Sequence, residues 1–311
     1  MARRLRIEYP GALHHVINRG NYRRDLFDSV GAAEAFLVTL FQAADKFGWR
    51  VHAYVLMPNH FHLAVETPEP NLGEGMHWLQ SSMATRFNRS RGESGHLFQG
   101  RYQALLIENV AALTRVVNYI HLNPVRAKIV PPEQVAGYRW SSLAALLRGP
   151  RPKSLTVLDW LRALGDWPDD ALGHRAYTAY LKALAQDEAA WQREGLVGLA
   201  QGWAIGTLAW RRALAKEHAA RALTAGLPRA ERIELRQASW YASLSANLAK
   251  RGKTASDLTT KPKKQSWKIE MAGEIRQQTG AAIAWLAEHL QLGTANSLRG
   301  YLHQVKRANN S

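Results

Sequence analysis

The spacing of apolar residues changes character several times in the first half of this chain. Short stretches are continuously apolar or alternate apolar with polar residues, a pattern that indicates strands. Longer stretches carry apolar residues at every third or fourth position, which indicates amphipathic helices. We expect strands at residues 12–18, 50–57, about 60–66 and 101–108. We expect helices at residues 32–47, 71–91 and 111–122, the last of them ended by Asn123 and Pro124.

The order of these elements predicts the fold of the first region. Strand, helix, strand, strand, helix, strand is the split βαββαβ arrangement of ferredoxin-like (RRM-like) domains. The fold class is therefore α+β, with an antiparallel sheet whose helices cover one face and leave the other free. The fold by itself does not determine an activity.

A change of composition predicts where this region ends. Residues 149–154, Gly-Pro-Arg-Pro-Lys-Ser, have the composition of a linker, and the pattern that follows is helical. We therefore expect a first domain at residues 1–148 and an all-helical extension at residues 155–311.

The end of the extension has the pattern of a helix-turn-helix. Two short amphipathic helices are expected within residues 281–307, separated by a turn around Gly293. Thr294 can cap the second helix, and Asn296 and Arg299 on its outer face are suited to phosphates or base edges. An ordinary helical hairpin is the alternative.

The charge of the chain narrows the class of partner. Lys and Arg number 41 and Asp and Glu 25, a net charge of +16, which favours a polyanion such as nucleic acid over a merely solvated basic surface. The absence of cysteine excludes disulfides and thiolate metal sites, and it favours a reducing cytoplasm. No apolar run is long enough to span a membrane.

Candidate chemistry begins with the sequence His60-Phe61-His62 in the third expected strand. Alternate residues of a strand face the same side, so the two imidazoles would project together and Phe61 would enter the core. Two adjacent imidazoles can bind a metal ion. The alternative is a pair of unrelated strand histidines.

A second pair of residues lies on the last helix of the first region. Tyr119 and Asn123 are four positions apart and therefore share a helix face. A tyrosine hydroxyl there could attack a phosphate, while the amide oxygen one turn later could complete a metal site. A core tyrosine and a helix-capping asparagine are the alternative.

Five stretches together resemble the REP-associated tyrosine transposases, a branch of the single-tyrosine HUH transposases. They occur in the family's order over roughly residues 8–145, and the rest of the chain resembles only in outline the helical extension that some members carry. The stretches are His15-Val16-Ile17-Asn18-Arg19-Gly20-Asn21, Met57-Pro58-Asn59-His60-Phe61-His62-Leu63, Phe98-Gln99-Gly100-Arg101-Tyr102, Tyr119-Ile120-His121-Leu122-Asn123-Pro124-Val125-Arg126-Ala127 and Tyr138-Arg139-Trp140-Ser141-Ser142.

The resemblance implies a metal site and a nucleophile. His60, His62 and Asn123 would bind Mg²⁺ or Mn²⁺, and Tyr119 would form a covalent 5′-phosphotyrosine with single-stranded DNA. The substrate would be a REP-like hairpin, cut and rejoined without ATP in a bacterial, nucleoid-associated, cytoplasmic setting. Whether the protein acts as a monomer or a homodimer stays open.

Arginines at three further positions are candidate phosphate contacts, with surface charge as the alternative for each. They are Arg19, Arg101 and Arg126.

Two other functions fit the same residues. The chain could be a hairpin-binding regulator that keeps the transposase fold, or a metal-dependent hydrolase in which water replaces the tyrosine. A covalent adduct is expected only for the transposase, binding without nicking for the regulator, and cleavage without an adduct for the hydrolase.

Overall fold

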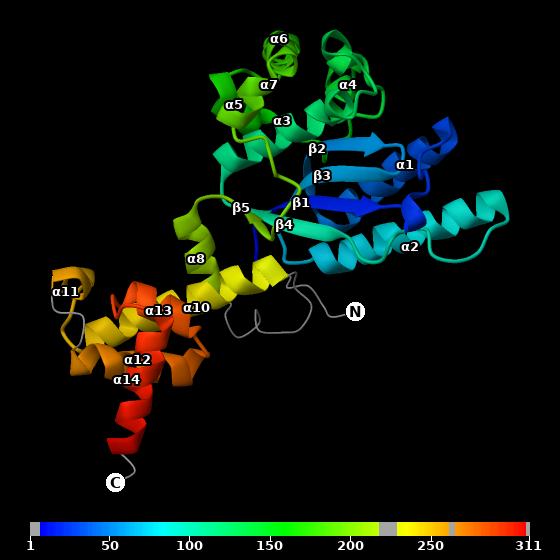
Figure 1. Cartoon of the computed structure of the whole chain (residues 1–311). Coiled ribbons are helices and arrows are strands. Elements are labelled where there is room, and N and C mark those ends of the chain that lie inside the picture. The colour runs from blue at the N-terminus through cyan, green and yellow to red at the C-terminus, as the bar shows by residue number, and fades with distance from the viewer. Residues whose placement is uncertain (1–6, 218–228, 261–264, 309–311) are drawn as a thin grey trace. The chain divides into compact units, whose positions relative to one another are not determined.

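The computed structural model describes residues 7–217, 229–260 and 265–308. The chain divides into two compact units, Arg6–Thr207 and a second one formed mainly by Leu208–Ser311 (Figure 1). Within the described residues, no helix combines the length and apolar composition needed to cross a membrane.

A mixed five-stranded sheet forms the centre of the first unit. Its order is β2-β3-β1-β4-β5, with the first four strands antiparallel and β5 parallel to β4. The first four strands and the two helices between them confirm the expected βαββαβ order. The elements are β1 (Ala12–Arg19), α1 (Val30–Phe47), β2 (Arg50–Met57), β3 (His60–Thr67), α2 (Leu72–Arg91), β4 (Gln103–Ile107) and β5 (Ala204–Ile205).

Local signals explain where the first helix begins and ends. The Ser29 hydroxyl accepts a hydrogen bond from the Ala32 amide at 3.2 Å and so caps the first turn of α1. Gly48 ends the helix in the left-handed conformation, with φ at 68°.

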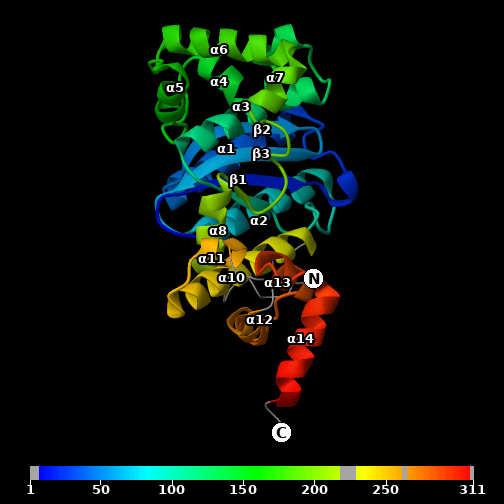
Figure 2. The same cartoon turned by 60° about the vertical axis from the view of Figure 1, so that its left-hand side comes forward.

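Helices cover both faces of the sheet, so the expectation of a free face is wrong. Val16 and Leu63 belong to the apolar cluster beneath α1 and α2. Alternate positions such as Val55 and Ala64 pack in a second cluster with α3 (Val110–Arg126), on the opposite side of the sheet (Figures 1 and 2). Two layers of core therefore enclose the strands that carry the histidines.

Helix α3 continues past the residues expected to end it. Asn123 and Pro124 lie inside the helix, which ends at Arg126. Proline removes one backbone donor, but it does so in the last turn, where the Ala127 amide still bonds to the Asn123 carbonyl at 2.9 Å. Nearly every residue from Ala112 to Val125 is buried, so tertiary packing outweighs the local preference.

The first unit also includes residues that the sequence assigned to a linker and to the extension. The Val51 amide donates to the Ser154 carbonyl at 2.7 Å, so the expected linker docks on the free edge of β2. Trp160 and Tyr177 are fully buried against α3. The boundary at residues 149–154 therefore moves to residue 207, because the edge of the sheet and the exposed face of α3 both need partners. The helical elements involved are η2 (Pro132–Gly137), α4 (Ser142–Arg148), α5 (Leu158–Gly165), α6 (Ala171–Gln186) and α7 (Glu188–Arg193).

The second unit is helical and has its own apolar core, which includes Met271, Leu286 and Leu298. Helices lie on both sides of the expected turn, and the Thr294 hydroxyl accepts from the Ser297 amide at 3.2 Å at the start of the last one. Gln291 occupies the left-handed position of the turn, with φ at 54°. The helices are α8 (Leu208–Glu217), α10 (Arg229–Lys250), α11 (Ala255–Thr260), α12 (Ser266–Thr279), α13 (Ile283–His289) and α14 (Ala295–Ala308).

Candidate active site

The two histidines of β3 share the face of the sheet that packs against α3. Strand pairing places His60 opposite Arg19 and His62 opposite Ile17 of β1. The two imidazole centroids are 5.2 Å apart. Phe61 points to the other face, where its ring lies 4.7 Å from that of Phe36. Alternation along the strand therefore separates the chemistry of the site from the core beneath it.

A chain of hydrogen bonds fixes the tautomer of His62. His15 of β1 donates from Nδ1 to the Leu199 carbonyl at 2.8 Å, because a carbonyl can only accept. The neutral His15 ring then has a bare Nε2, which accepts from Nδ1 of His62 at 3.0 Å. The lone pair of His62 is consequently on Nε2, where it is available to a metal ion.

His60 is oriented in the same way by its neighbour in the chain. Its Nδ1 donates to Oδ1 of Asn59 at 2.8 Å, so its lone pair is also on Nε2. Asn59 belongs to the turn between β2 and β3, and its amide nitrogen lies 3.4 Å from the Arg23 carbonyl. Hydrogen-bonded support of this kind is usual for histidines that bind metals.

Burial keeps these imidazoles neutral. Burial, with a smaller effect from the charge of Arg19, lowers the pKa of His60 to about 4. Burial holds the pKa of His62 well below its ordinary value, with smaller effects from neighbouring His15 and from Arg126. Burial also lowers the pKa of His15 to about 4. Neutral imidazoles are the form that binds cations.

Tyr119 of α3 lies against this pair. Its ring centroid is 5.6 Å from that of His62 and 5.7 Å from that of His15, both edge to face. The guanidinium of Arg126 lies over the tyrosine ring at 4.4 Å. The tyrosine is 6% exposed as a whole residue, so its ring is held within the packing of α3 on the sheet.

Asn123 lies one helical turn after Tyr119. Its amide nitrogen donates to the Tyr119 carbonyl at 2.9 Å, which leaves its Oδ1 as the group able to serve a cation. It is 7% exposed. The sequence therefore placed both residues on one helix face, and the packing of α3 on the sheet places Tyr119 beside His62.

His60, His62 and Asn123 suit a divalent ion that is bound by imidazole nitrogens and oxygens. They do not form a cluster of acidic and histidine side chains. Among the described residues, no three His, Asp or Glu side chains are grouped to hold a metal. His15 is near His62, but its Nε2 is occupied by the hydrogen bond. A set of two imidazole nitrogens and one amide oxygen suits Mg²⁺ or Mn²⁺ only when phosphate or water supplies further oxygen ligands.

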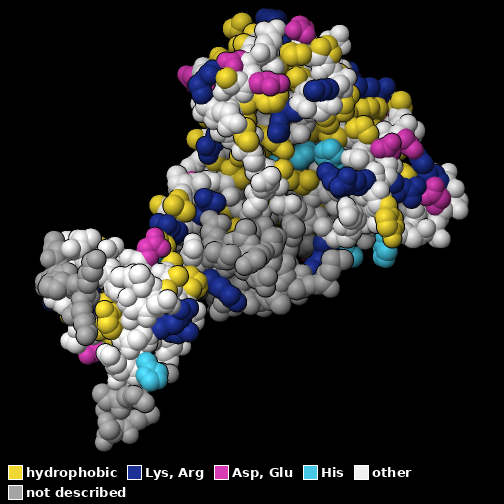
Figure 3. Space-filling view, in the orientation of Figure 1, with side chains coloured by type: hydrophobic (Ala, Val, Ile, Leu, Met, Phe, Trp, Pro, Cys, Tyr) yellow, Lys and Arg dark blue, Asp and Glu magenta, His cyan; other side chains and the backbone are white. Residues whose placement is uncertain are grey.

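Positive charge flanks the histidines. Arg19 is exposed and Arg126 is half-buried, and the charge of each lowers the pKa of His62. Figure 3 shows histidine side chains at the surface of the first unit with Lys and Arg side chains beside them. Arg101 is exposed in the segment before β4, and no described contact joins it to the site.

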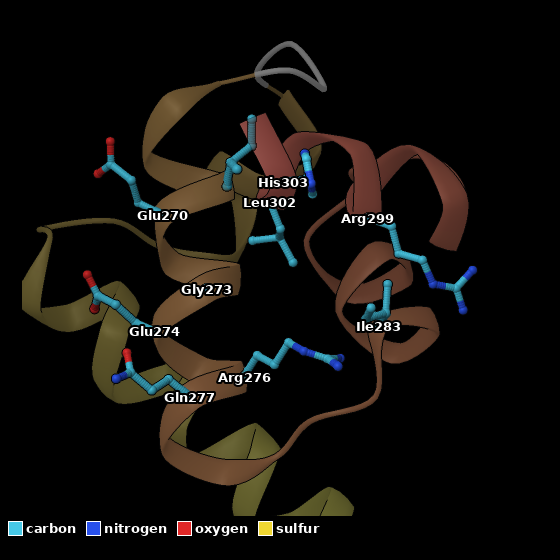
Figure 4. Close-up of a pocket in the computed structure, with 10 residues that line it drawn as sticks. Glu270, Gly273, Glu274, Arg276, Gln277, Ile283, Arg299, Leu302 and His303 are labelled. Carbon is cyan, nitrogen blue, oxygen red and sulfur yellow. The ribbon is translucent and has the colours of Figure 1, made fainter. Parts of the chain in front are cut away.

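The other predicted DNA contacts lie in the second unit. Asn296 and Arg299 are exposed on α14 and bond to each other at 2.6 Å. A cavity of about 790 Å³ lies between α12 and α14, and Figure 4 shows Arg276 reaching toward Ile283 across it while Glu270 points away. None of the predicted catalytic residues lines this cavity.

Sequence reasoning missed the residues that support the histidines. His15 was recognised only as part of a motif, and Asn59 only as part of a turn. A signal for His15 exists, since it alternates with Ile17 in an apolar strand, but the strand order is needed to place it beside His62. Leu199 carries no signal because it acts through its backbone.

The region that holds the candidate site matches a known protein family. Residues 9–123 match the family described as "Transposase IS200 like". This region, which holds the histidine pair, Tyr119 and Asn123, is similar to the IS200-like transposases. The expected kinship with the single-tyrosine transposases is thereby confirmed.

Two solved structures are similar to this chain. One is a REP-associated tyrosine transposase bound to a REP hairpin, with 20% identity over 51% of this chain and 91% of that chain, at a TM-score of 0.41. The other is a candidate transposase from Deinococcus radiodurans R1, with 19% identity over 41% of this chain and 92% of that chain, at a TM-score of 0.28. No curated protein matches the chain.

Proposed function

We propose that this protein is a metal-dependent single-stranded DNA nickase and strand transferase that acts on hairpin DNA through a covalent 5′-phosphotyrosine. The observation that carries the proposal is the pairing of two imidazoles, each with its lone pair on Nε2, with a tyrosine ring 5.6 Å from His62. The match of residues 9–123 to the IS200-like transposases supports the same chemistry.

Each residue of the site has a separate role in the proposed reaction. His60, His62 and Asn123 would hold Mg²⁺ or Mn²⁺, which when bound polarises the scissile phosphate and lowers the charge that opposes attack. Tyr119 attacks the phosphorus, its hydroxyl proton passes to solvent water, and the new phosphotyrosine bond forms as the bond from phosphorus to the 3′-oxygen breaks. The 3′-oxygen takes up a proton, and reversal of the step rejoins a strand without ATP.

The surrounding arginines orient the reacting groups and do not take part in the chemical step. Arg126 holds the tyrosine ring by lying over its face, and Arg19 contributes charge beside His60. Most of the Tyr119 side chain is buried, which fixes the position of its ring against the histidines.

The second unit supplies affinity for DNA in this proposal. Leu208–Ser311 contains 18 Lys and Arg against seven Asp and Glu, a net of +11 out of the +16 of the whole chain. Asn296 and Arg299 on α14 are residue types that read base edges, and α14 is the second helix of the helix-turn-helix. The stem of a hairpin is the matching ligand.

A labelled-DNA experiment tests the proposal. Hairpins with randomised single-stranded flanks are incubated with the protein and Mn²⁺ and then separated on a denaturing gel. A 3′-labelled strand should migrate with the protein, and a 5′-labelled strand should become a shorter free fragment. EDTA should abolish both products.

Two other results would point to the competing functions. Binding without nicking would identify the chain as a hairpin-binding regulator, which the charge of the second unit also suits. Cleavage of 5′-labelled DNA without a protein adduct would identify a hydrolase that uses water.

A further inference from the structure

The loop after β1 contains two residues in an unusual backbone conformation. Tyr22 has φ at 52° and ψ at 26°, and Arg23 has φ at 60°, within the short 3₁₀ segment Asn21–Arg23. Side chains other than glycine rarely occupy this left-handed region. Two such residues in succession persist only where surrounding contacts hold them, and strain of this kind concentrates at binding sites.

Hydrogen bonds fix this loop to the turn that supports His60. The Gly20 amide donates to the Asn59 carbonyl and the Leu26 amide to the Pro58 carbonyl, both at 2.8 Å. The Asn59 amide nitrogen lies 3.4 Å from the Arg23 carbonyl, while its oxygen accepts from His60. The loop is therefore held at the end of the sheet that carries the first metal-ligand candidate.

The strained loop presents an aromatic ring to solvent. Tyr22 is 92% exposed, and it is the only exposed Phe, Tyr or Trp among the residues whose side chains the structure describes. Folding favours burial of tyrosine, so a backbone strained to hold the ring outward points to a ligand that covers it. The tryptophans are half-buried or buried and offer no comparable platform.

Positive charge accompanies the ring. Arg23 and Arg19 are exposed, and Arg19 stands opposite His60 in the strand pairing. Arg24 is instead paired with Glu93 at 2.7 Å. An exposed ring next to arginines is the combination that binds single-stranded nucleic acid, in which bases stack and the backbone is neutralised.

We propose that Tyr22 stacks on an unpaired base next to the scissile phosphate, with Arg19 and Arg23 contacting the adjoining phosphates. The proposal rests on the single-stranded DNA substrate of the proposed function. It adds a base-binding position at the end of the sheet, beside His60 and outside the nucleophile and ligand set.

The stacking proposal is tested by measuring DNA binding under conditions in which no cleavage occurs. The full-length protein carrying Tyr119→Phe is titrated in EDTA into two single-stranded dodecamers. Binding to a dodecamer of thymidine is followed by fluorescence anisotropy. The second dodecamer contains 2-aminopurine at alternate positions, and the fluorescence of 2-aminopurine falls when it stacks. Tyr22→Ala removes the ring and keeps the Cβ, while Tyr22→Phe and Tyr22→Trp keep a stacking face. Leu172→Ala, at a position 64% exposed on α6, is the matched control.

Tyr22→Ala should weaken binding by about tenfold and abolish the quenching, as expected for one stacked base. The Phe and Trp variants and the Leu172 control should stay within about twofold of the parent, a change too small for the loss of a stacked base. The slope of log affinity against log salt should be unchanged by Tyr22→Ala but reduced by about 0.7 by Arg23→Ala.

Equal binding and quenching by the Ala and Phe variants would overturn the stacking proposal, even if Tyr119 forms its adduct. A parent protein that fails to bind the single strands at low salt would overturn the proposed function together with it. Thermal unfolding of each variant shows whether weaker binding comes from the missing ring or from a destabilised fold.

Discussion

At the scale of single residues, the site depends on which atom of each side chain is left unpaired. Both β3 histidines donate from Nδ1, and the Asn123 amide nitrogen donates to its own helix. The remaining lone pairs are the ones a cation needs. The sequence identifies the residues, but the hydrogen bonds identify the atoms.

Replacing the nucleophile should separate chemistry from binding. Tyr119→Phe removes only the hydroxyl, while the ring keeps its contacts with His15, His62 and Arg126. Cleavage should fall by about a thousandfold or more, with hairpin affinity nearly unchanged. Single-turnover nicking and a binding titration on the same hairpin provide the measurement, and undiminished nicking would exclude Tyr119 as the nucleophile.

Another buried histidine should make the first unit sensitive to acid. His14 is 1% exposed, neither ring nitrogen has a hydrogen-bond partner among the described residues, and burial lowers its pKa to about 4. Because the folded pKa lies below that of the unfolded chain, unfolding takes up a proton. The free energy of unfolding therefore falls as pH decreases from 6.5 to about 4.

The His14→Phe variant measures this effect. It should reduce the fall in unfolding free energy between these pH values by about 3 kcal/mol, since each unit of pKa difference corresponds to about 1.4 kcal/mol. Urea unfolding across the pH range gives the number. Parallel stability curves for parent and variant would show that the proton is taken up elsewhere.

At the scale of elements, the site joins β1, β3, α3 and the segment before β5. Strand alternation and the helical period place residues in pairs within each element, whereas the relay from Leu199 through His15 to His62 connects three of them. The ends of elements were less predictable. Pro124 was expected to end a helix that continues because it is buried.

Two substitutions at His15 separate the halves of the relay. His15→Gln can still accept from His62, whereas His15→Asn can still donate to the Leu199 carbonyl but does not reach His62. His15→Asn should weaken Mn²⁺ binding by about 10- to 100-fold, the usual effect of removing a supporting hydrogen bond, and His15→Gln should retain most of the affinity.

The metal affinity and the His62 tautomer can both be measured without DNA cleavage. Mn²⁺ titration followed by electron paramagnetic resonance gives the affinity, and long-range ¹H–¹⁵N spectra of the metal-free protein give the His62 tautomer. Only His15→Asn should let the proton move to Nε2. Equal affinities in the two variants, at similar unfolding temperatures, would mean that His15 serves packing alone.

At the scale of the whole molecule, the structure changes where the chain can be divided. A cut at residue 150 would expose the face of α3 that Trp160, Tyr177 and Leu181 cover, and all three are fully buried. Burial of each such side chain contributes about 1.5–3 kcal/mol, and a whole domain is stable by only about 5–15 kcal/mol.

Residues 1–207 should unfold cooperatively, and residues 1–150 should not. Circular dichroism and urea titration would test both fragments, and cooperative unfolding of residues 1–150 would restore the domain boundary at residues 149–154.

The folded 1–207 fragment should then show what the second unit contributes. It should still form the tyrosine adduct at high protein concentration, because all the candidate ligands and the nucleophile remain. Its hairpin affinity should fall, and the salt slope should flatten by about 0.7–0.9 for each phosphate that the fragment no longer binds. Unchanged affinity and slope across a salt series would assign Leu208–Ser311 another role.

The sequence by itself determined the first four strands, the first three helices and the pairs His60–His62 and Tyr119–Asn123, because backbone geometry sets which neighbours in a chain share a face. It could not determine the linker's docking, the covered second face or the partners of those pairs. His15 meets a carbonyl 184 residues away, and Tyr22 is held by the turn before His60. Such contacts arise from strand order and from the burial of α3, which depend on the packing of the whole unit rather than on any local pattern.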